Sequence, residues 1–247
     1  MNILILMAGN TKDFEEKGYS YPKYLIEIQN KPMIQRTIES LNKVGEKIIC
    51  VIRKEDQEKY FFGDTIKILC PNCNIIEVVG ETKGATCTAL FAIDEINNDE
   101  ELLIVNGSQF IKTDITPAIT DFRKRNLDGG IITINAVHPK YSSVLLDENN
   151  FVLQTSEKRP ISNIASTGCC YFKKGADFIG AAFSSIEKDV STQGLYYISS
   201  TFNEMILNSK KIGVYEIPKK DYISFANYQM YENYLSHRRG EEDKWLI

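Results

Sequence analysis

The sequence lacks the features that mark a membrane protein or a DNA-binding protein. No apolar run approaches the roughly 18 residues that a transmembrane helix needs. Residues 1–9 contain no basic leader, and their apolar part is too short for a signal peptide, so they are predicted to form a buried strand. Basic residues are not in excess, since 29 Lys and Arg stand against 33 Asp and Glu. We therefore expect no membrane span and no nucleic-acid partner.

Histidine is scarce, and the cysteines lack a complete metal-binding pattern. The neighbours of the two histidines, His138 and His237, do not suggest a catalytic triad. Cys70 and Cys73 have half of a zinc-ribbon spacing, but no second pair or suitably spaced histidine accompanies them, so a metal or redox role is not favoured. The six cysteines lie on or beside apolar stretches, which without an export signal predicts reduced thiols and a cytoplasmic location.

The overall composition is that of a globular protein with a sizeable core. Hydrophobic residues make up 43% of the chain and charged residues 25%, which excludes disorder and a disulfide scaffold. Because α/β folds reach about 250 residues as one unit, residues 1–247 are expected to form a single domain.

Apolar, β-branched runs alternate with amphipathic stretches along the chain. Strands are predicted at 3–7, 47–52, 74–79, 101–105, 130–136, 167–172 and 212–217, and helices at 32–44, 85–97, 174–188, 197–207 and 227–238. Segments 141–146 and 151–157 flank a turn-rich tetrapeptide and are predicted to form a hairpin. This order predicts an α/β fold with a mostly parallel central sheet, helices on both faces and a small antiparallel excursion.

Ligands of open α/β sheets bind at the carboxyl ends of the strands, and several polar segments fall there. After the first strand, Gly9 permits a tight turn and Lys23 is a candidate contact for a phosphate; a solvated lysine beside a turn proline is the alternative. Gly84 precedes a helix whose first backbone amides would point toward a ligand above the sheet. The alternative is an ordinary capped helix start without a ligand. Polar residues at 106–109 abruptly follow a buried apolar run, which makes them candidates for contacts with a ligand. A loop that turns at Gly107 explains this change equally well. Residues 157–160 place an acid beside two bases, in a binding site or in a solvated turn.

Read together, these segments resemble the nucleotidyltransferase (sugar-phosphate pyrophosphorylase-like) superfamily. The likeness is to the small enzymes of bacterial capsule and lipopolysaccharide clusters, a branch that includes phosphoglutamine cytidylyltransferases. It covers nearly the whole chain and is carried by Met7-Ala8-Gly9, Pro22-Lys23, Lys31-Pro32-Met33-Ile34, Gly84-Ala85, Asn106-Gly107-Ser108-Gln109-Phe110, Glu157-Lys158-Arg159-Pro160, Thr167-Gly168 and Phe202-Asn203-Glu204.

The resemblance implies a Rossmann-like, GT-A-type three-layer fold and a transfer reaction. A nucleoside monophosphate would pass from a nucleoside triphosphate, with CTP or UTP favoured, to a phosphorylated small-molecule acceptor, and pyrophosphate would be released. Residues 1–136 would bind the nucleotide and 137–238 the acceptor, and the resemblance also implies a homodimer. The nucleotide-binding residues would be Met7, Ala8, Gly9, Lys12, Lys23, Gly84, Ala85, Asn106 and Gly107. The acceptor-binding residues would be Glu157, Lys158, Gly168 and Asn203, with Lys23 and Lys158 as the catalytic pair. Gly84 is expected to let the nucleobase approach the backbone.

Three departures from the family pattern bear on catalysis. The usual Gly-Ser/Thr-Arg triplet is replaced by Asn10-Thr11-Lys12, so Lys12 would supply a point charge in place of an arginine fork. The metal-binding aspartate falls on Ser108, which leaves a neutral hydroxyl as the expected ligand of Mg²⁺ or Mn²⁺. The late metal-carboxylate segment is also altered, around 224–229.

These departures leave two alternatives to an active nucleotidyltransferase open. One is a catalytically degenerate relative that binds nucleotide or a partner enzyme as a regulator or scaffold. The other is a glycosyltransferase of the same fold, although residues 106–108 do not supply the Asp-x-Asp-type ligand pair that such enzymes generally carry.

Overall fold

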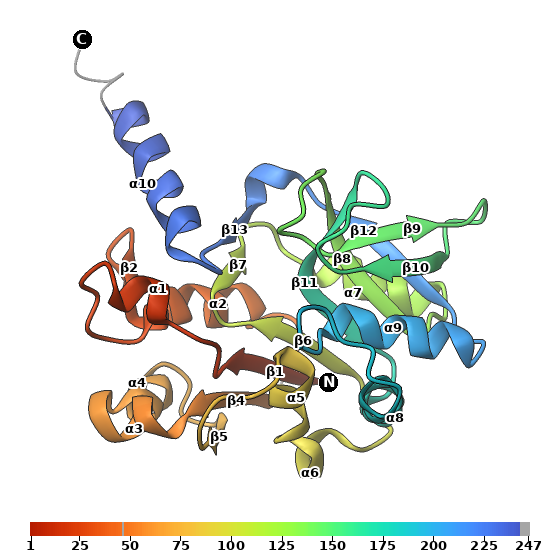
Figure 1. Cartoon of the computed structure of the whole chain (residues 1–247), viewed down its shortest axis with the longest axis horizontal. Coiled ribbons are helices and arrows are strands. Elements are labelled where there is room, and N and C mark those ends of the chain that lie inside the picture. The colour runs from red at the N-terminus through yellow and green to blue at the C-terminus, as the bar shows by residue number, and fades with distance from the viewer. Residues whose placement is uncertain (46, 243–247) are drawn as a thin grey trace.

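One large β-sheet runs through the molecule. The computed structural model describes residues 1–45 and 47–242 (Figure 1). In this part of the chain the sheet contains nine strands. They are β1 (Asn2–Met7), β4 (Lys47–Arg53), β5 (Asn74–Val78), β6 (Leu102–Asn106), β8 (Gly129–Asn135), β9 (Ser143–Leu146), β10 (Val152–Ser156), β11 (Ile164–Phe172) and β12 (Ile212–Glu216).

The sheet is parallel except around one central strand and one hairpin. Strands β5, β4, β1 and β6 lie side by side in parallel, with β1 between β4 and β6. Strand β11 runs antiparallel between β6 and β8, and β12 adds to β8 in parallel. The hairpin of β9 and β10 joins the amino-terminal half of β11 through the pair of Ser143 and Ala165.

Helices cover both faces of the sheet, and the alternation of side chains along β1 explains why. Ile3, Ile5 and Met7 point to one face, where they pack with α2 (Met33–Leu41), α4 (Phe62–Leu69) and α7 (Thr116–Lys124). Leu4 and Leu6 point to the other face, with α5 (Ala85–Leu90), α6 (Ile93–Ile96), α8 (Gly175–Glu187) and α9 (Ile198–Leu207). A strand buried on both faces must be apolar throughout, as β1 is. The predicted fold class is confirmed.

A third, aromatic cluster fixes the last helix onto the loop that follows β1. Phe14 of α1 (Lys12–Glu15) packs edge-on against Tyr228, the first residue of α10 (Tyr228–Glu242). Phe225 packs against Tyr231 of the same helix. The smaller elements nearby are η1 (Lys23–Leu25), β2 (Glu27–Ile28), β3 (Lys31–Pro32), β7 (Gln109–Ile111), η2 (Lys219–Asp221) and β13 (Tyr222–Ser224). Beyond the cluster, α10 extends away from the body of the molecule (Figure 1).

The predicted strands and the hairpin are all present with slightly different ends, but the helix predictions were incomplete. The expected helix at 85–97 is two helices, because the amides of Phe91 and Ala92 bond to carbonyls only three residues back. The sequence also missed α3 (Lys54–Tyr60), which exposes most of its side chains and has no apolar stripe, as well as α4 and α7. The terminal helix continues past the expected end at 238 to Glu242.

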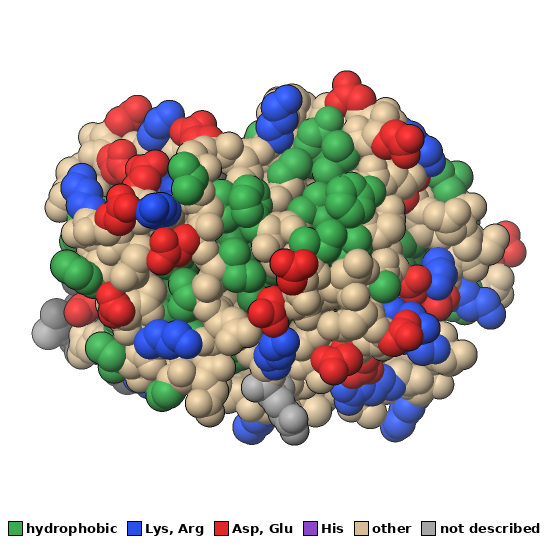
Figure 2. Space-filling view, turned by 90° about the horizontal axis from the view of Figure 1, so that it is seen from below, with side chains coloured by type: hydrophobic (Ala, Val, Ile, Leu, Met, Phe, Trp, Pro, Cys, Tyr) green, Lys and Arg blue, Asp and Glu red, His purple; other side chains and the backbone are tan. Residues whose placement is uncertain are grey.

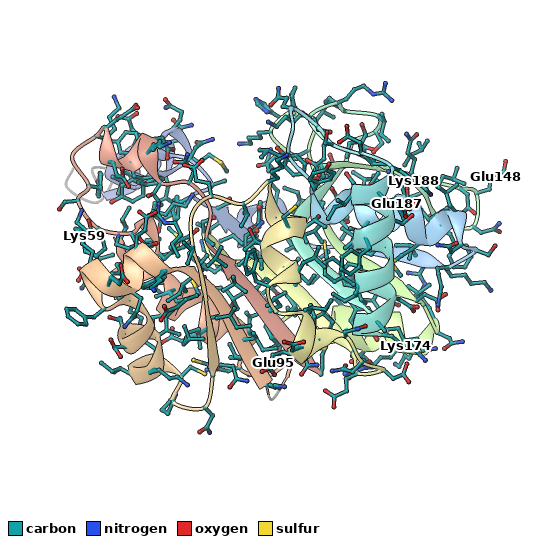
Figure 3. All side chains as sticks on the ribbon, turned by 60° about the horizontal axis from the view of Figure 1, so that its bottom comes forward. Lys59, Glu95, Glu148, Lys174, Glu187 and Lys188 are labelled. Atoms are coloured by element: carbon teal, nitrogen blue, oxygen red, sulfur yellow. The ribbon has the colours of Figure 1, made fainter. Side chains whose placement is uncertain are left out.

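Charged groups are distributed over the outside of the molecule. Lys59 and Glu148 lie at opposite outer edges, and Lys188 pairs with Glu204 across 2.6 Å (Figure 3). The Glu204 carboxylate is buried and Lys188 is exposed, so loss of the lysine would leave a buried charge without its partner. Within the described residues, none of the helices combines the length and the apolar character that a membrane crossing would require.

Gly175, at the start of α8, is expected to tolerate no side chain. A Cβ atom at this position would lie 1.8 Å from the carbonyl oxygen of Ile96. Such overpacking costs about 1–3 kcal/mol or more, so Gly175→Ala should lower the free energy of unfolding in urea by at least that amount. Gly180 lies in the same helix with nothing within 4 Å of its Cβ position. Gly180→Ala should therefore raise the free energy of unfolding by up to about 1 kcal/mol. Equal shifts in both variants would contradict this account.

Candidate nucleotide and acceptor site

The predicted nucleotide-binding segments meet at one edge of the sheet. Met7 ends β1, Arg53 ends β4 and Asn106 ends β6, and the three strands are parallel neighbours. After β1 the chain first forms β4 and β5 on one side of β1 and then returns to form β6 on the other side. The carboxyl end of β1 is therefore at a topological switch point. The side chain of Met7 is fully buried against Gly107, which leaves only its backbone available to a ligand.

Lys23 is enclosed at this edge rather than solvated. Its side chain is 5% exposed, and Nζ donates to the carbonyl oxygens of Asn10 (3.4 Å) and Ala226 (3.0 Å). Burial lowers the pKa of Lys23 to about 8, and nearby Asp13 partly opposes this shift. The hydrogen-bond acceptors of this buried cation are neutral carbonyls, and its amine also lies over the rings of Phe14 (5.7 Å) and Tyr24 (5.8 Å). None of these groups carries a negative charge, so an anion placed beside Lys23 would be stabilised. The alternative of a solvated surface lysine is wrong.

Lys12 is held at the surface by a neighbouring loop. Its Nζ atom lies 3.1 Å from Oε1 of Glu81, and both side chains are mostly exposed. Its backbone N–H donates to Oδ1 of Asn10 (2.7 Å). An exposed ion pair costs little to break, so the Lys12 amine is free to exchange its carboxylate partner for a phosphate.

Arg53 is a second cation at this edge that sequence reasoning missed. Its guanidinium donates two hydrogen bonds to the buried carboxylate of Asp56 (2.9 and 2.8 Å) and one to Oγ1 of Thr11 (3.0 Å). Through Thr11 it fixes the loop that follows β1. Arg53 could have been identified from the sequence, because it is the last residue of a predicted strand and ligands bind at the carboxyl ends of such strands.

Gly84 is required for a reason other than the expected approach of a nucleobase. Its φ angle is +101°, and a Cβ atom would lie 2.5 Å from the carbonyl oxygen of Tyr196. The amide of Thr86 donates to that same oxygen (3.1 Å), and the amide of Tyr196 donates to the carbonyl of Lys83 (2.8 Å). The glycine therefore lets the segment around Tyr196 dock on the amino end of α5, where Ala85 begins the helix.

Asn106 and Gly168 meet where β6 lies beside β11. A Cβ atom at Gly168 would lie 2.9 Å from Nδ2 of Asn106, and β11 is irregular here, between Ser166 and Cys170. This places Gly168, a predicted acceptor residue, against Asn106, a predicted nucleotide residue.

The side chains around Ser108 do not fit a metal ion held by the protein. Ser108 is nearly buried, and its carbonyl accepts a hydrogen bond from the amide of Phe225 (2.8 Å). In the described residues, no group of three or more His, Cys, Asp or Glu side chains is placed to hold a metal. Mg²⁺ in proteins is usually bound by one or two carboxylates. At the position of the family's aspartate the chain offers only the neutral hydroxyl of Ser108, and within the described residues it belongs to no such cluster.

Glu157 is the most enclosed of the predicted acceptor residues. Its carboxylate accepts hydrogen bonds from the hydroxyls of Ser142 and Ser199. Burial raises the pKa of Glu157, and the two hydroxyls offset part of that effect. Neighbouring Lys158 has a left-handed backbone (φ 55°), and its amine donates to the side-chain carbonyl of Gln193.

The side chain of Asn203 binds the backbone of a neighbouring strand, and its role in acceptor binding stays a prediction. Its Oδ1 accepts from the amide of Thr155 (2.8 Å), and its Nδ2 donates to the carbonyl of Thr155 (3.0 Å). Because both ends of the side-chain amide bind the backbone of β10, Asn203 holds that strand beside α9.

One short segment, 193–199, connects the two groups of predicted residues. Tyr196 packs on Gly84, Gln193 accepts from Lys158, and Ser199 donates to Glu157. We call residues 193–199 the connecting segment. Sequence reasoning did not assign Gln193, Ser142 or Ser199 to the site, because their partners lie far away in the chain.

The family model described as nucleotidyl transferase matches residues 3–217. The chain is 27% identical over 218 residues to the bifunctional protein GlmU of Methanocaldococcus jannaschii, which covers 87% of this chain and 49% of that protein. It is also 27% identical over 209 residues to a bifunctional sugar-1-phosphate nucleotidylyltransferase/acetyltransferase of Sulfurisphaera tokodaii, covering 83% and 48%. The chain thus spans about half the length of these two relatives.

Solved structures share the fold at low sequence identity. A nucleoside-diphosphate-sugar pyrophosphorylase from Vibrio cholerae RC9 has a TM-score of 0.84 at 21% identity, with 96% of this chain and all of that chain covered. The inositol-1-phosphate CTP transferase from T. maritima has a TM-score of 0.70 at 13% identity, with 93% and 90% covered. The resemblance expected from the sequence is confirmed, and the chain belongs to the nucleotidyl transferase family.

Proposed function

We propose that the protein transfers a nucleoside monophosphate from a nucleoside triphosphate, with CTP or UTP favoured, to a phosphorylated small-molecule acceptor. Buried Lys23 carries this proposal, because a lysine with a lowered pKa whose hydrogen-bond acceptors are neutral carbonyls is suited to an incoming polyphosphate. An oxygen of the acceptor phosphate attacks the α-phosphorus in line. The bond from the α-phosphorus to the bridging oxygen breaks, and pyrophosphate leaves.

The cations at the edge of the sheet would bind and orient the triphosphate. Lys23 would compensate the phosphates directly, and Lys12 would leave Glu81 to do the same. Arg53 would act by holding Thr11 and with it the loop after β1. Because the side chains near Ser108 do not fit a resident metal, magnesium or manganese would enter as part of the substrate, bound to the triphosphate.

Glu157 and Lys158 would position the acceptor opposite the nucleotide. The Glu157 carboxylate would accept a hydrogen bond from a polar group of the acceptor, and the Lys158 amine would leave Gln193 to bind its phosphate. Bringing the two reactants together in one orientation supplies a large part of such a rate enhancement. In this proposal residues 1–136 bind the nucleotide and 137–238 the acceptor.

The biological setting that we propose is the synthesis of surface polysaccharide, capsule or lipopolysaccharide, in the cytoplasm by a homodimer. Hydrophobic side chains gather in the middle of one face of the molecule (Figure 2). Phe91, which directly follows α5, and Phe183 of α8 are each 51% exposed, and helices α5 and α8 are in contact. Apolar patches on a protein surface often mark an interface, which supports the homodimer.

A second candidate function follows from the side chains around Ser108. If the missing carboxylate is essential, the protein binds nucleotide without turning it over and acts as a regulator or scaffold of the same pathway.

Pyrophosphate release tests the proposed function. The protein is incubated with each of CTP, UTP, GTP and ATP, with a panel of phosphorylated sugars, polyols and amides, and with Mg²⁺ or Mn²⁺. We expect release that requires both the nucleotide and one class of acceptor. A shift in thermal unfolding on nucleotide addition without any release would favour the regulator. If the protein shows no nucleotide binding and no pyrophosphate release across the panel, both proposed functions are overturned.

Lys23→Met should lower kcat/KM for the nucleotide by about 100-fold, the usual loss for one charged group at a developing anion. The pH dependence gives a second readout. Lys23 is charged below a pKa of about 8 and neutral above it, so the affinity of the free enzyme for nucleotide should fall as pH rises through 8. Between pH 7 and 9 the charged fraction drops from about nine tenths to about one tenth.

The matched control is Lys17→Met, an exposed lysine in the same loop. It should keep the wild-type kcat/KM and the wild-type pH profile. If Lys23→Met retained the fall in affinity near pH 8, another group would be responsible.

Glu157→Gln should raise KM for the acceptor about tenfold or more, since a charge-assisted hydrogen bond contributes about 1.5–3 kcal/mol. KM for the nucleotide should stay unchanged. Glu148→Gln is the control, because Glu148 lies at the outer edge of the same hairpin (Figure 3). Steady-state kinetics with each substrate varied in turn measures both KM values. A rise in KM for the nucleotide alone would refute the assignment of Glu157 to acceptor binding.

A further inference from the structure

Three cysteine thiols converge at the sheet edge opposite the nucleotide loops. Cys50 is buried in β4, and Cys70 and Cys73 lie in the turn between α4 and β5. Strand β5 pairs with β4 so that Cys50 lies opposite Ile75, two residues after Cys73. The neighbouring Cys73 raises the pKa of both Cys50 and Cys70, which is consistent with this convergence. The sequence showed only the Cys-x-x-Cys spacing, because the third thiol comes from another strand.

The turn already has the geometry that a disulfide needs. The amide of Cys73 donates to the carbonyl of Cys70 (3.1 Å), and Pro71 occupies the second position of the turn. A β-turn brings its first and fourth Cα atoms within about 7 Å of each other, close to the range of about 4.4–6.8 Å that a disulfide spans. All six cysteines are free thiols in the structure.

The three thiols are not equivalent. The hydrogen bond from Cys50 and the nearby Lys67 amine, which binds the carbonyl of Cys73, lower the pKa of Cys73 to about 7. Burial raises the pKa of Cys70, and the contact with Cys73 and burial raise that of Cys50. Cys70 is partly exposed, whereas Cys73 and Cys50 have no exposed surface. Cys70 is therefore the sulfur that a reagent reaches, Cys73 the thiolate behind it, and Cys50 the donor that stabilises the thiolate.

We propose that the Cys70–Cys73 turn is a thiol–disulfide exchange site for small-molecule disulfides, RSSR. The Cys70 sulfur, as its thiolate, attacks one sulfur of RSSR, forms a mixed disulfide and releases RS⁻. The Cys73 thiolate then attacks the Cys70 sulfur, closes the Cys70–Cys73 disulfide and releases the second RS⁻. The protein loses two thiol protons and two electrons, RSSR gains the two electrons, and the two thiolates take up the protons.

The exchange site is independent of the proposed nucleotide site. The turn precedes the amino end of β5, whereas Lys12, Lys23 and Gly84 lie beyond the carboxyl ends of β1 and β5. Because strands β1, β4 and β5 are parallel, the two sites are at opposite edges of the sheet. Failure of nucleotidyl transfer would leave the exchange site untouched, and the converse also holds.

The test is oxidation of the folded full-length protein with oxidised glutathione, followed by peptide mass spectrometry. In the wild type we expect loss of two thiols per chain and a Cys70–Cys73 disulfide. Cys73→Ser should trap glutathione on Cys70, and Cys70→Ser should leave Cys73 unmodified. Cys50→Ala should slow closure of the disulfide at pH 7 about tenfold or more, because the pKa of Cys73 would return toward about 8.5. Its rate should recover at pH 9.

Cys87→Ser is the matched control, since Cys87 is also partly exposed but belongs to α5. It should leave the rate of formation of the Cys70–Cys73 disulfide unchanged. Absence of that disulfide in the oxidised wild type would overturn the proposal. So would a Cys73→Ser variant that carries glutathione on Cys87 and none on Cys70. Circular dichroism of each variant confirms that it is folded.

Discussion

The burial of one ammonium group organises the ligand-binding edge of this protein. Lys23 binds the carbonyls of Asn10 and Ala226, and so joins the loop after β1 to the segment that leads into α10. Enclosing a cation costs several kcal/mol unless it is well compensated, and two carbonyls compensate it only in part, as the fall of its pKa to about 8 indicates. The aromatic cluster of Phe14 and Tyr228 stabilises the same junction. The fold thus maintains a charge that becomes favourable when an anion arrives.

The connecting segment carries the same constraint to the other half of the molecule. Tyr196 packs on Gly84 and makes backbone hydrogen bonds to Lys83 and Thr86. This fixes where Gln193 and Ser199 meet Lys158 and Glu157. A shift of this segment would therefore move both groups of residues together. Because a displacement of about 1 Å is enough to reduce a reaction rate substantially, a single segment that touches both sides is an economical way to keep two substrates aligned.

The sequence predicted what depends on local pattern and missed what depends on distant contacts. Alternation in β1 and the polar residues after each strand were enough for the fold class and for Lys23 and Glu157 as candidates. Arg53 could have been found by the same strand-end rule. The two hydroxyl partners of Glu157 are Ser142 and Ser199, and they could not have been found in this way. No residue near them in the chain indicates that a carboxylate from another element lies beside them. The contacts of Asn203 with the backbone of Thr155 were missed for the same reason, since Thr155 lies on β10.

The chain has 33 acidic residues, yet the carboxylates beside the nucleotide loop are already engaged. Asp56 accepts two hydrogen bonds from Arg53, Asp13 accepts one from the amide of Tyr228 (2.6 Å), and Glu81 pairs with Lys12. Recruiting Asp56 or Asp13 as a metal ligand would break a contact that fixes the loop or the start of α10. In the proposed reaction, charge compensation at this edge would therefore fall on the lysines and on cations that arrive with the substrate. Of the three carboxylates, only Glu81 sits in an exposed pair, so its release of Lys12 is the least costly rearrangement open to the site.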